Sequence, residues 1–231
     1  FVVMGFHHIL EGIDHLLFLF CLIIPFRRIR PLIAIVTAFT AAHSITLISA
    51  AYHYGPDAVW FPPLIETLIA ASIFYMALEN IVVTSPKRRW IITFCFGLVH
   101  GFAFSFGLQN TLQFAGSHLL LSLLSFNIGI ELGQLLVLAL CVPLLNLVLG
   151  RVVAERMGVI ILSAIIGHQA WHWMIDRLGV LRQFPWPAFT LADAVSGLRW
   201  AFAVVALAAL LWLVTLVARR WVPGELPRRE A

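Results

Sequence analysis

Long apolar runs separated by short polar segments occupy most of this chain, and they constrain its fold more than any other feature. A helix that crosses the hydrocarbon core of a bilayer needs about 20 mainly apolar residues. Windows of high hydropathy, bounded by Pro, Gly and basic clusters, place seven such runs. They cover residues 4–25, 31–54, 62–84, 90–108, 118–149, 153–176 and 197–220. The sequence therefore predicts an all-α polytopic bundle of seven transmembrane helices, one domain over residues 1–231.

The composition excludes most soluble classes of protein. Of the 231 residues, 61% are hydrophobic and 11% are charged, whereas a soluble domain has about 45–50% apolar and about 25% charged residues. So little charge cannot cover a soluble globule, which excludes a cytosolic enzyme and a disordered chain. No nucleic-acid partner is expected despite the net charge of +4, because the basic residues fall in short loop clusters. The lipid bilayer is the expected environment.

Basic residues set the predicted orientation. Lys and Arg cluster after the first, third and fifth predicted spans and in the C-terminal tail, and the loops after the second and fourth spans have neither. Cytoplasmic loops carry the excess of Lys and Arg. We therefore expect a bacterial inner-membrane protein with its N-terminus outside and its C-terminus in the cytoplasm. The chain begins at Phe1 without a cleavable signal before the first span, so we expect a mature or trimmed product.

Ionisable residues in the first span are the first functional candidates, because such groups are costly inside a bilayer. This span contains five of them: His7, His8, Glu11, Asp14 and His15. On one continuous helix, His8, Glu11 and His15 would share a face, with Asp14 about 100° to the side. The alternative is a water-exposed N-terminal segment that precedes a span starting near Gly12. That alternative suits Asp14 and His15 less well, because an apolar run follows them at once.

A midplane metal or proton site is the main prediction from the remaining spans. One ionisable residue lies near the midpoint of each of four spans: His15, His43, His100 and Glu131. Glycines flank several of these positions and permit close helix approach. Neutral imidazole and carboxylate together suit Zn²⁺, Ni²⁺ or Co²⁺. The alternative is that each histidine is a hydrogen-bonded structural residue.

Further polar residues fall near the ends of spans or beside the midplane candidates. Glu66 lies near the outer end of the third span, where it would join His7 and His8 in a vestibule. His168 and His172 lie one turn apart near the outer end of the sixth span, a spacing that can chelate a divalent ion. Polar support for the site is expected from residues within the same spans: Ser44, Ser72, Glu79, Asn80, Asn127 and Gln134. Glu79 would alternatively face the basic loop that follows it.

Several other functions lack their required residues. The only lysine, Lys87, lies in a predicted loop, so no span offers a Schiff base to retinal. No Walker A motif is present for direct coupling to ATP, and no CxxCH motif for covalent haem. Ligation of haem by His43 and His100 is a minor alternative.

The motifs of the spans, taken in order, resemble the HupE/UreJ family of membrane proteins. The segments Gly5-Phe6-His7-His8-Ile9 and Gly12-Ile13-Asp14-His15-Leu16-Leu17-Phe18 resemble its GxxH…GxDHLLF signature. Further matching segments are 37–47, 65–73, 79–81, 96–102 and 126–134. The resemblance covers about residues 4–140 and is similar to the longer branch of the family, which often carries an extracytoplasmic N-terminal domain. One departure is Ile9 after His8, where nickel-linked members often have proline.

The resemblance implies a secondary transporter of nickel or cobalt. The family's polar set would correspond here to His8, Asp14, His15, His43, Glu66, Glu79, His100 and Glu131. In this hypothesis, the ion passes His7, His8 and Glu11, with His168 and His172 as accessory ligands. It then pauses at the midplane residues, and Asp14 orients an imidazole.

An intramembrane metal-dependent hydrolase is the second hypothesis. Three histidines with Asp14 or Glu131 would bind Zn²⁺ and leave a position for water, and Ser44 and Ser72 would steady an oxyanion. Both hypotheses require a divalent transition metal, nickel, cobalt or zinc, as substrate or bound ion. The oligomeric state is left open, a homo-oligomer included.

Overall fold

The computed structural model describes residues 1–185, apart from residues 27, 55, 57, 83–85, 113–117 and 150–153. For residues 86–87 and 104–112 it describes the backbone but not the side chains. The predicted span 197–220 and the predicted cytoplasmic C-terminus lie outside the described residues.

The described residues form seven α-helices and no β-strand, which confirms the all-α prediction. The helices are α1 (Val2–Glu11), α2 (Ile13–Ile23), α3 (Ile29–Ala51), α4 (Phe61–Val82), α5 (Pro86–Leu112), α6 (Leu119–Val148) and α7 (Glu155–Leu181). Helices α3, α4, α6 and α7 begin and end within five residues of the predicted spans, and α5 contains the predicted span 90–108. The positions of Pro and Gly between the apolar runs therefore predict most of the helix ends.

The first predicted span is not one continuous helix, and in that respect the prediction for residues 4–25 is wrong. The chain bends by 73° between α1 and α2. Gly12 separates the two helices in an extended conformation, with φ −76° and ψ 92°. Glycine is a poor helix former because folding restricts its backbone most, so a break is cheapest at this residue. Asp14 and His15 consequently lie in the first turn of a separate helix.

Four helices, α3, α4, α6 and α7, are long and apolar enough to cross a membrane. The bent pair α1 and α2 would make a fifth span if it is counted as one. These numbers refer to the described residues, so the predicted count of seven spans and the predicted orientation stay predictions. The described part of the chain is an all-helical membrane protein.

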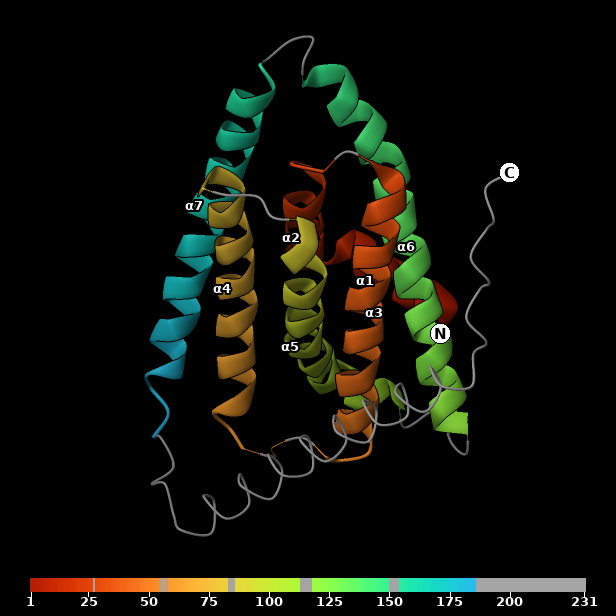
Figure 1. Ribbon diagram of the computed structural model, residues 1–231. Helices are drawn as coiled ribbons and strands as arrows, with labels where there is room; N and C mark the ends of the chain where they lie inside the picture. The colour runs from red at the N-terminus through yellow and green to blue at the C-terminus, as the bar shows by residue number, and fades with distance from the viewer. Residues whose placement is uncertain are drawn as a thin grey trace, which may run out of the picture. The chain divides into compact units, whose positions relative to one another are not determined.

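The helices pack as neighbouring pairs that are distant in sequence (Figure 1). Helix α3 packs against α5 and α6, α4 packs against α7, and α1 packs against α6. The α1–α6 contact needs two glycines, because a Cβ at Gly5 would overlap the carbonyl oxygen of Phe126 and one at Gly129 would overlap that of Val2. These close approaches bring the short α1, and the His8 that it carries, against the long spans.

Candidate metal centre

Four imidazoles from four helices gather inside the bundle. We call His8 of α1, His15 of α2, His43 of α3 and His100 of α5 the histidine cluster. The ring centroids are 4.7 Å apart for His8 and His15, 6.2 Å for His15 and His43, and 5.2 Å for His15 and His100. Candidate ligand atoms of His8, His15 and His43 all lie within 4.8 Å of one another. His100 and His43 are fully buried.

The backbone brings these rings together at two places. The 73° bend at Gly12 turns α2 away from the direction of α1, and His8 and His15 meet edge to face across it. At Gly101 a Cβ would overlap the carbonyl oxygen of His43. The glycine therefore permits the close approach of α5 to α3 that places His100 in the cluster.

Asn127 of α6 fixes the tautomer of His43. Its Nδ2 donates to the carbonyl of Leu123 at 2.9 Å, which leaves its Oδ1 as the acceptor, 3.3 Å from Nδ1 of His43. The proton of a neutral His43 then belongs on Nδ1, and Nε2 carries a lone pair. Within the described part of the chain, this Nε2 is buried without a hydrogen-bond partner. A hydrogen bond that orients one imidazole nitrogen while the other faces a metal is typical of metal centres.

Ser72 of α4 does the same for His100. Its hydroxyl donates to the carbonyl of Ile69 at 2.7 Å, so its oxygen accepts from Nε2 of His100 at 3.1 Å. The lone pair of His100 then lies on Nδ1, which is buried and has no hydrogen-bond partner among the described residues. His15 Nε2 is also buried without a hydrogen-bond partner in that part of the chain.

Aromatic rings surround the histidine cluster. Phe39 lies 5.2 Å from the ring of His100 and stacks on His43 at 6.1 Å, and Phe18 lies 5.2 Å from His100. On the side of α6, Phe126 lies 5.6 Å from His8. An apolar wall makes it costly to leave polar atoms without partners, so the buried lone pairs of the cluster favour an ion as their partner.

A polar ladder between α3 and α6 contains Glu131. Thr37 donates to Oε1 of Glu131 at 2.6 Å, and Thr40 donates to Oε1 of Gln134 at 2.8 Å. Thr37 lies six residues before His43, or about 9 Å along the helix. The three-residue ligand group of the described residues does not include Glu131. Its Oε2 is nevertheless buried without a hydrogen-bond partner in that part of the chain.

A cavity of about 520 Å³, which we call the vestibule, reaches His8 and His15. Asp14, Trp173 and Arg177 also line it. Arg177 of α7 lies 3.5 Å from a carboxylate oxygen of Asp14 and 3.9 Å from one of Glu66. Asp14 is therefore paired with an arginine in the vestibule, and Glu66 belongs to the same ion-pair group.

Two pairs of candidate residues lie within single helices. Nδ1 of His7 lies 3.2 Å from Glu11 on the exposed side of α1, where 58% and 75% of the two side chains are accessible. Glu11 also lines the vestibule together with His8 and His15. His168 and His172 of α7 are exposed, with their Nε2 atoms 3.2 Å apart. Ser44 donates to the carbonyl of Thr40, one turn earlier in α3.

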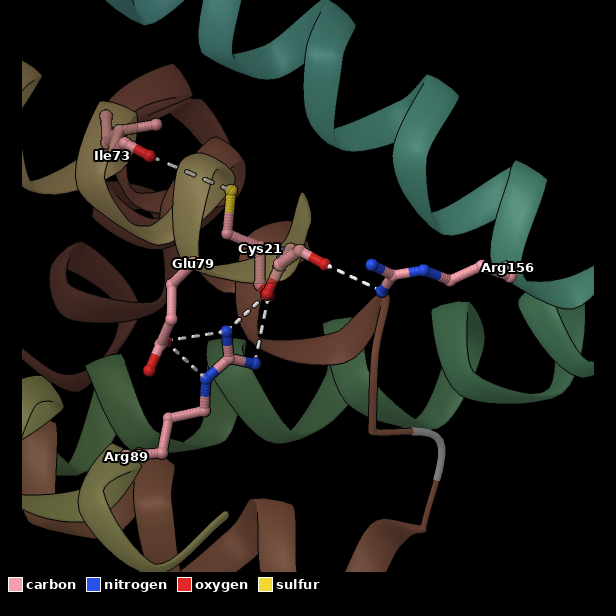
Figure 2. Close-up of polar contacts among 6 residues, drawn as sticks. Cys21, Ile73, Glu79, Arg89 and Arg156 are labelled. Atoms are coloured by element: carbon pink, nitrogen blue, oxygen red, sulfur yellow. Dashed lines mark hydrogen bonds and ion pairs between the residues drawn. The ribbon is translucent and has the colours of Figure 1, made fainter. Parts of the chain in front are cut away.

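A buried arginine organises the opposite end of α4 (Figure 2). Arg89 of α5 is fully buried and binds Glu79 through Nε at 3.2 Å and through Nη2 at 3.1 Å. Asn80 accepts from Arg89 and donates to the carbonyl of Cys21 at 2.9 Å, and Arg89 Nη1 also donates to that carbonyl at 3.4 Å. We call Glu79, Asn80, Arg89 and the Cys21 carbonyl the arginine network. Glu79 and Asn80 thus link α2, α4 and α5 rather than the histidine cluster.

Sequence reasoning counted Arg89 and Arg177 as loop charges and gave no site role to Thr37 or Trp173. The signals for the two arginines are weak but present. Arg89 follows Glu79 and Asn80 across a short connection, and Arg177 lies one turn after Trp173 in α7. Helical periodicity alone does not tell whether such an arginine turns inward.

Comparison with known proteins identifies a family over most of the chain. A family model described as "HupE / UreJ protein" matches residues 1–177. No curated protein matches the chain, and no solved structure does. The matched region contains the histidine cluster, the vestibule and the arginine network.

Proposed function

Because the chain belongs to the HupE/UreJ family, we propose that it is a secondary transporter of a divalent transition metal, with nickel or cobalt as the substrate. The family is associated with transport of these two metals. In this proposal, the protein lies in a bacterial inner membrane with α1 starting outside. The ion is the substrate that moves, and it pauses at the histidine cluster on its way.

The observation that carries the proposal is the set of lone pairs in the histidine cluster. His15, His43 and His100 each present a buried ring nitrogen that makes no hydrogen bond within the described residues. Asn127 and Ser72 engage the opposite nitrogens of His43 and His100. Imidazole ligands suit Ni²⁺, Co²⁺ and Zn²⁺ and do not suit Mg²⁺ or Ca²⁺. A site of this chemistry selects transition metals.

The ligand spacing suits a site that binds and releases. One ion with metal–nitrogen bonds of about 2.0–2.1 Å needs its ligands roughly 3–4 Å apart. The three tightest ligand atoms lie within 4.8 Å, so small ring rotations would close the site on an ion. Protons would compete with the metal for the same nitrogens, which supplies a chemical basis for coupling metal movement to a proton gradient.

A zinc-dependent hydrolase is supported less well by the same residues. Ser44 and Ser72 donate their hydroxyl protons to the carbonyls of Thr40 and Ile69. Neither proton is directed at a position where an oxyanion would form beside the cluster. The arrangement favours binding of an ion over acyl-transfer chemistry.

Uptake of ⁶³Ni²⁺ or ⁵⁷Co²⁺ into liposomes that contain the purified protein tests the proposal. Wild-type protein is expected to move the metal, and His15→Ala and His43→Ala are expected to lose uptake. His53→Asn is the matched control, because His53 is an exposed histidine after α3 with a positive φ of 60° that asparagine tolerates. Uptake that is unchanged in both cluster variants would contradict the proposal. One tightly bound zinc ion per protein, without uptake of nickel or cobalt, would favour the hydrolase.

A further inference from the structure

The vestibule of a proposed cation transporter contains a fixed positive charge. The guanidinium of Arg177 reaches from α7 to Asp14 of α2 at 3.5 Å and to Glu66 of α4 at 3.9 Å. It also lies over the ring of Trp173, 5.4 Å from the centroid. This is the same cavity that reaches His8 and His15. A metal ion that enters this cavity therefore meets an arginine as well as the imidazoles.

The arginine is held loosely enough to be displaced. Strong charge-assisted hydrogen bonds are about 2.7–2.9 Å long, and both contacts of Arg177 exceed that. Arg177, Asp14 and Glu66 are 27%, 30% and 57% exposed, so water competes for each of them. Nη1 of Arg177 is buried and makes no hydrogen bond with any described residue. The side chain consequently has spare donors and no rigid anchor.

Asp14 and Glu66 would attract the wrong ions without this arginine. Two carboxylates on neighbouring helices are the ligands that Mg²⁺ and Ca²⁺ prefer. These cations gain little from imidazole, whereas Ni²⁺ and Co²⁺ gain the histidine cluster just beyond. Mg²⁺ or Ca²⁺ therefore gains no further ligand that would offset the free-energy cost of displacing Arg177 from the two carboxylates.

We propose that Arg177 is a specificity-determining residue that occupies the Asp14 and Glu66 carboxylates as a tethered cation and excludes hard divalent ions from the vestibule. The selection of the transported metal by Arg177 rests on the proposed transport function. The binding of ions at Asp14 and Glu66 is measurable without transport. A transition-metal ion that proceeds to His15 pushes the guanidinium aside, and the arginine returns after the ion has passed.

Terbium luminescence tests the binding claim in detergent. Tb³⁺ prefers oxygen ligands as Ca²⁺ does and is sensitised by a nearby indole, which Trp173 supplies. Wild-type protein is expected to bind Tb³⁺ weakly, and Arg177→Gln is expected to bind it at least about tenfold more tightly, because the competing charge is gone. Added Ca²⁺ should quench the signal. The gain should vanish in Arg177→Gln/Glu66→Gln.

Two control variants separate charge from folding effects. Arg177→Lys keeps a cation in the vestibule and is expected to resemble the wild type. Arg182→Gln removes an exposed arginine just after the same helix and is also expected to resemble it. The proposal is overturned if Arg177→Gln binds Tb³⁺ no better than the wild type. It is also overturned if the gain persists without Glu66.

A measurement on the wild-type protein keeps the proposal testable if Arg177→Gln fails to fold. Millimolar Mg²⁺ or Ca²⁺ is expected to leave cobalt uptake into liposomes unchanged. Inhibition of that uptake by either ion would overturn the proposal. Absence of both nickel and cobalt uptake by the wild type would instead refute the transport function. Where Arg177→Gln folds, its terbium binding still decides the role of Arg177.

Discussion

The histidine cluster and the arginine network are both buried polar groups between helices, yet they differ in how their polar atoms are satisfied. All three guanidinium nitrogens of Arg89 have acceptors, supplied by Glu79, Asn80 and the Cys21 carbonyl. In the cluster, His15, His43 and His100 each have a buried nitrogen without a hydrogen-bond partner among the described residues. The arginine network, in which each guanidinium nitrogen has an acceptor, connects helices. Buried atoms that retain lone pairs are suited to a ligand.

This difference separates residues of the same chemical type. Glu79 and Glu131 are both carboxylates in long spans. Glu79 receives two hydrogen bonds from Arg89, whereas Glu131 receives one from Thr37 and keeps a buried oxygen without a partner in the described residues. The first is therefore expected to contribute more to stability than the second.

The largest effect is expected from breaking the arginine network. Glu79→Gln would leave the charge of Arg89 buried without its counter-ion, and removing one partner of a buried pair costs about 3–5 kcal/mol. Thermal unfolding in detergent should show the loss, and cobalt binding by the folded fraction should not change. The control Glu11→Gln, on the exposed side of α1, should alter stability by less than about 0.5 kcal/mol. Equal stability of Glu79→Gln and the wild type would show that the network is dispensable.

Asn127→Leu is expected to have the largest effect on metal binding among residues that would not touch the ion. It removes the acceptor that fixes the His43 tautomer. Loss of such an orienting partner weakens metal affinity by about 10–100-fold. Cobalt titration by calorimetry measures the change, and Asn146→Leu, an exposed position later in α6, serves as the control. Wild-type affinity in Asn127→Leu would contradict the assigned tautomer.

Ser72→Ala is expected to weaken cobalt binding less, by up to about tenfold, at the low end of the effect of an orienting partner. Ser72 supports His100, which lies outside the three-histidine ligand group. Ser49→Ala in α3, whose hydroxyl bonds only its own helix at the Ile45 carbonyl in the described structure, is the matched control. A loss as large as that of Asn127→Leu would make His100 an equal ligand.

Thr37→Val is expected to have the smallest effect. It removes one hydrogen bond to Glu131, worth about 1 kcal/mol of stability, and cobalt affinity should stay at the wild-type value. The same titration decides the outcome. Weakened cobalt binding would place Glu131 in the metal centre, as the sequence alone predicts for four midplane residues.

Much of the fold could be predicted because membrane spans are local features. The punctuation at Pro31, Pro62 and Pro86 lies within the first residues of α3, α4 and α5. The bend at Gly12 could not be predicted, because His8, Glu11 and His15 fit a continuous helical face equally well. The extended backbone of Gly12 and the 73° bend in the structure show where α1 ends.

The sequence predicts which residues form the site better than it predicts how they are arranged. His8, His15, His43 and His100 follow from the cost of ionisable groups inside spans, and the structure brings them together. Equal depth also suggested Glu131, and its place in the metal centre stays a prediction, because depth does not specify rotation about the helix axis. Side-chain rotation likewise directs Arg89 and Arg177 inward, which loop charge counting cannot reveal.

Cobalt K-edge X-ray absorption of the purified protein tests the central claim most directly, because it reports the ligand atoms themselves. The account predicts nitrogen ligands at about 2.0–2.1 Å with the outer-shell scattering of imidazole. It predicts that this signal is lost in His15→Ala/His43→Ala and retained in His53→Asn. An oxygen-only shell in the wild type, or an imidazole signal that survives the double substitution, would contradict the account.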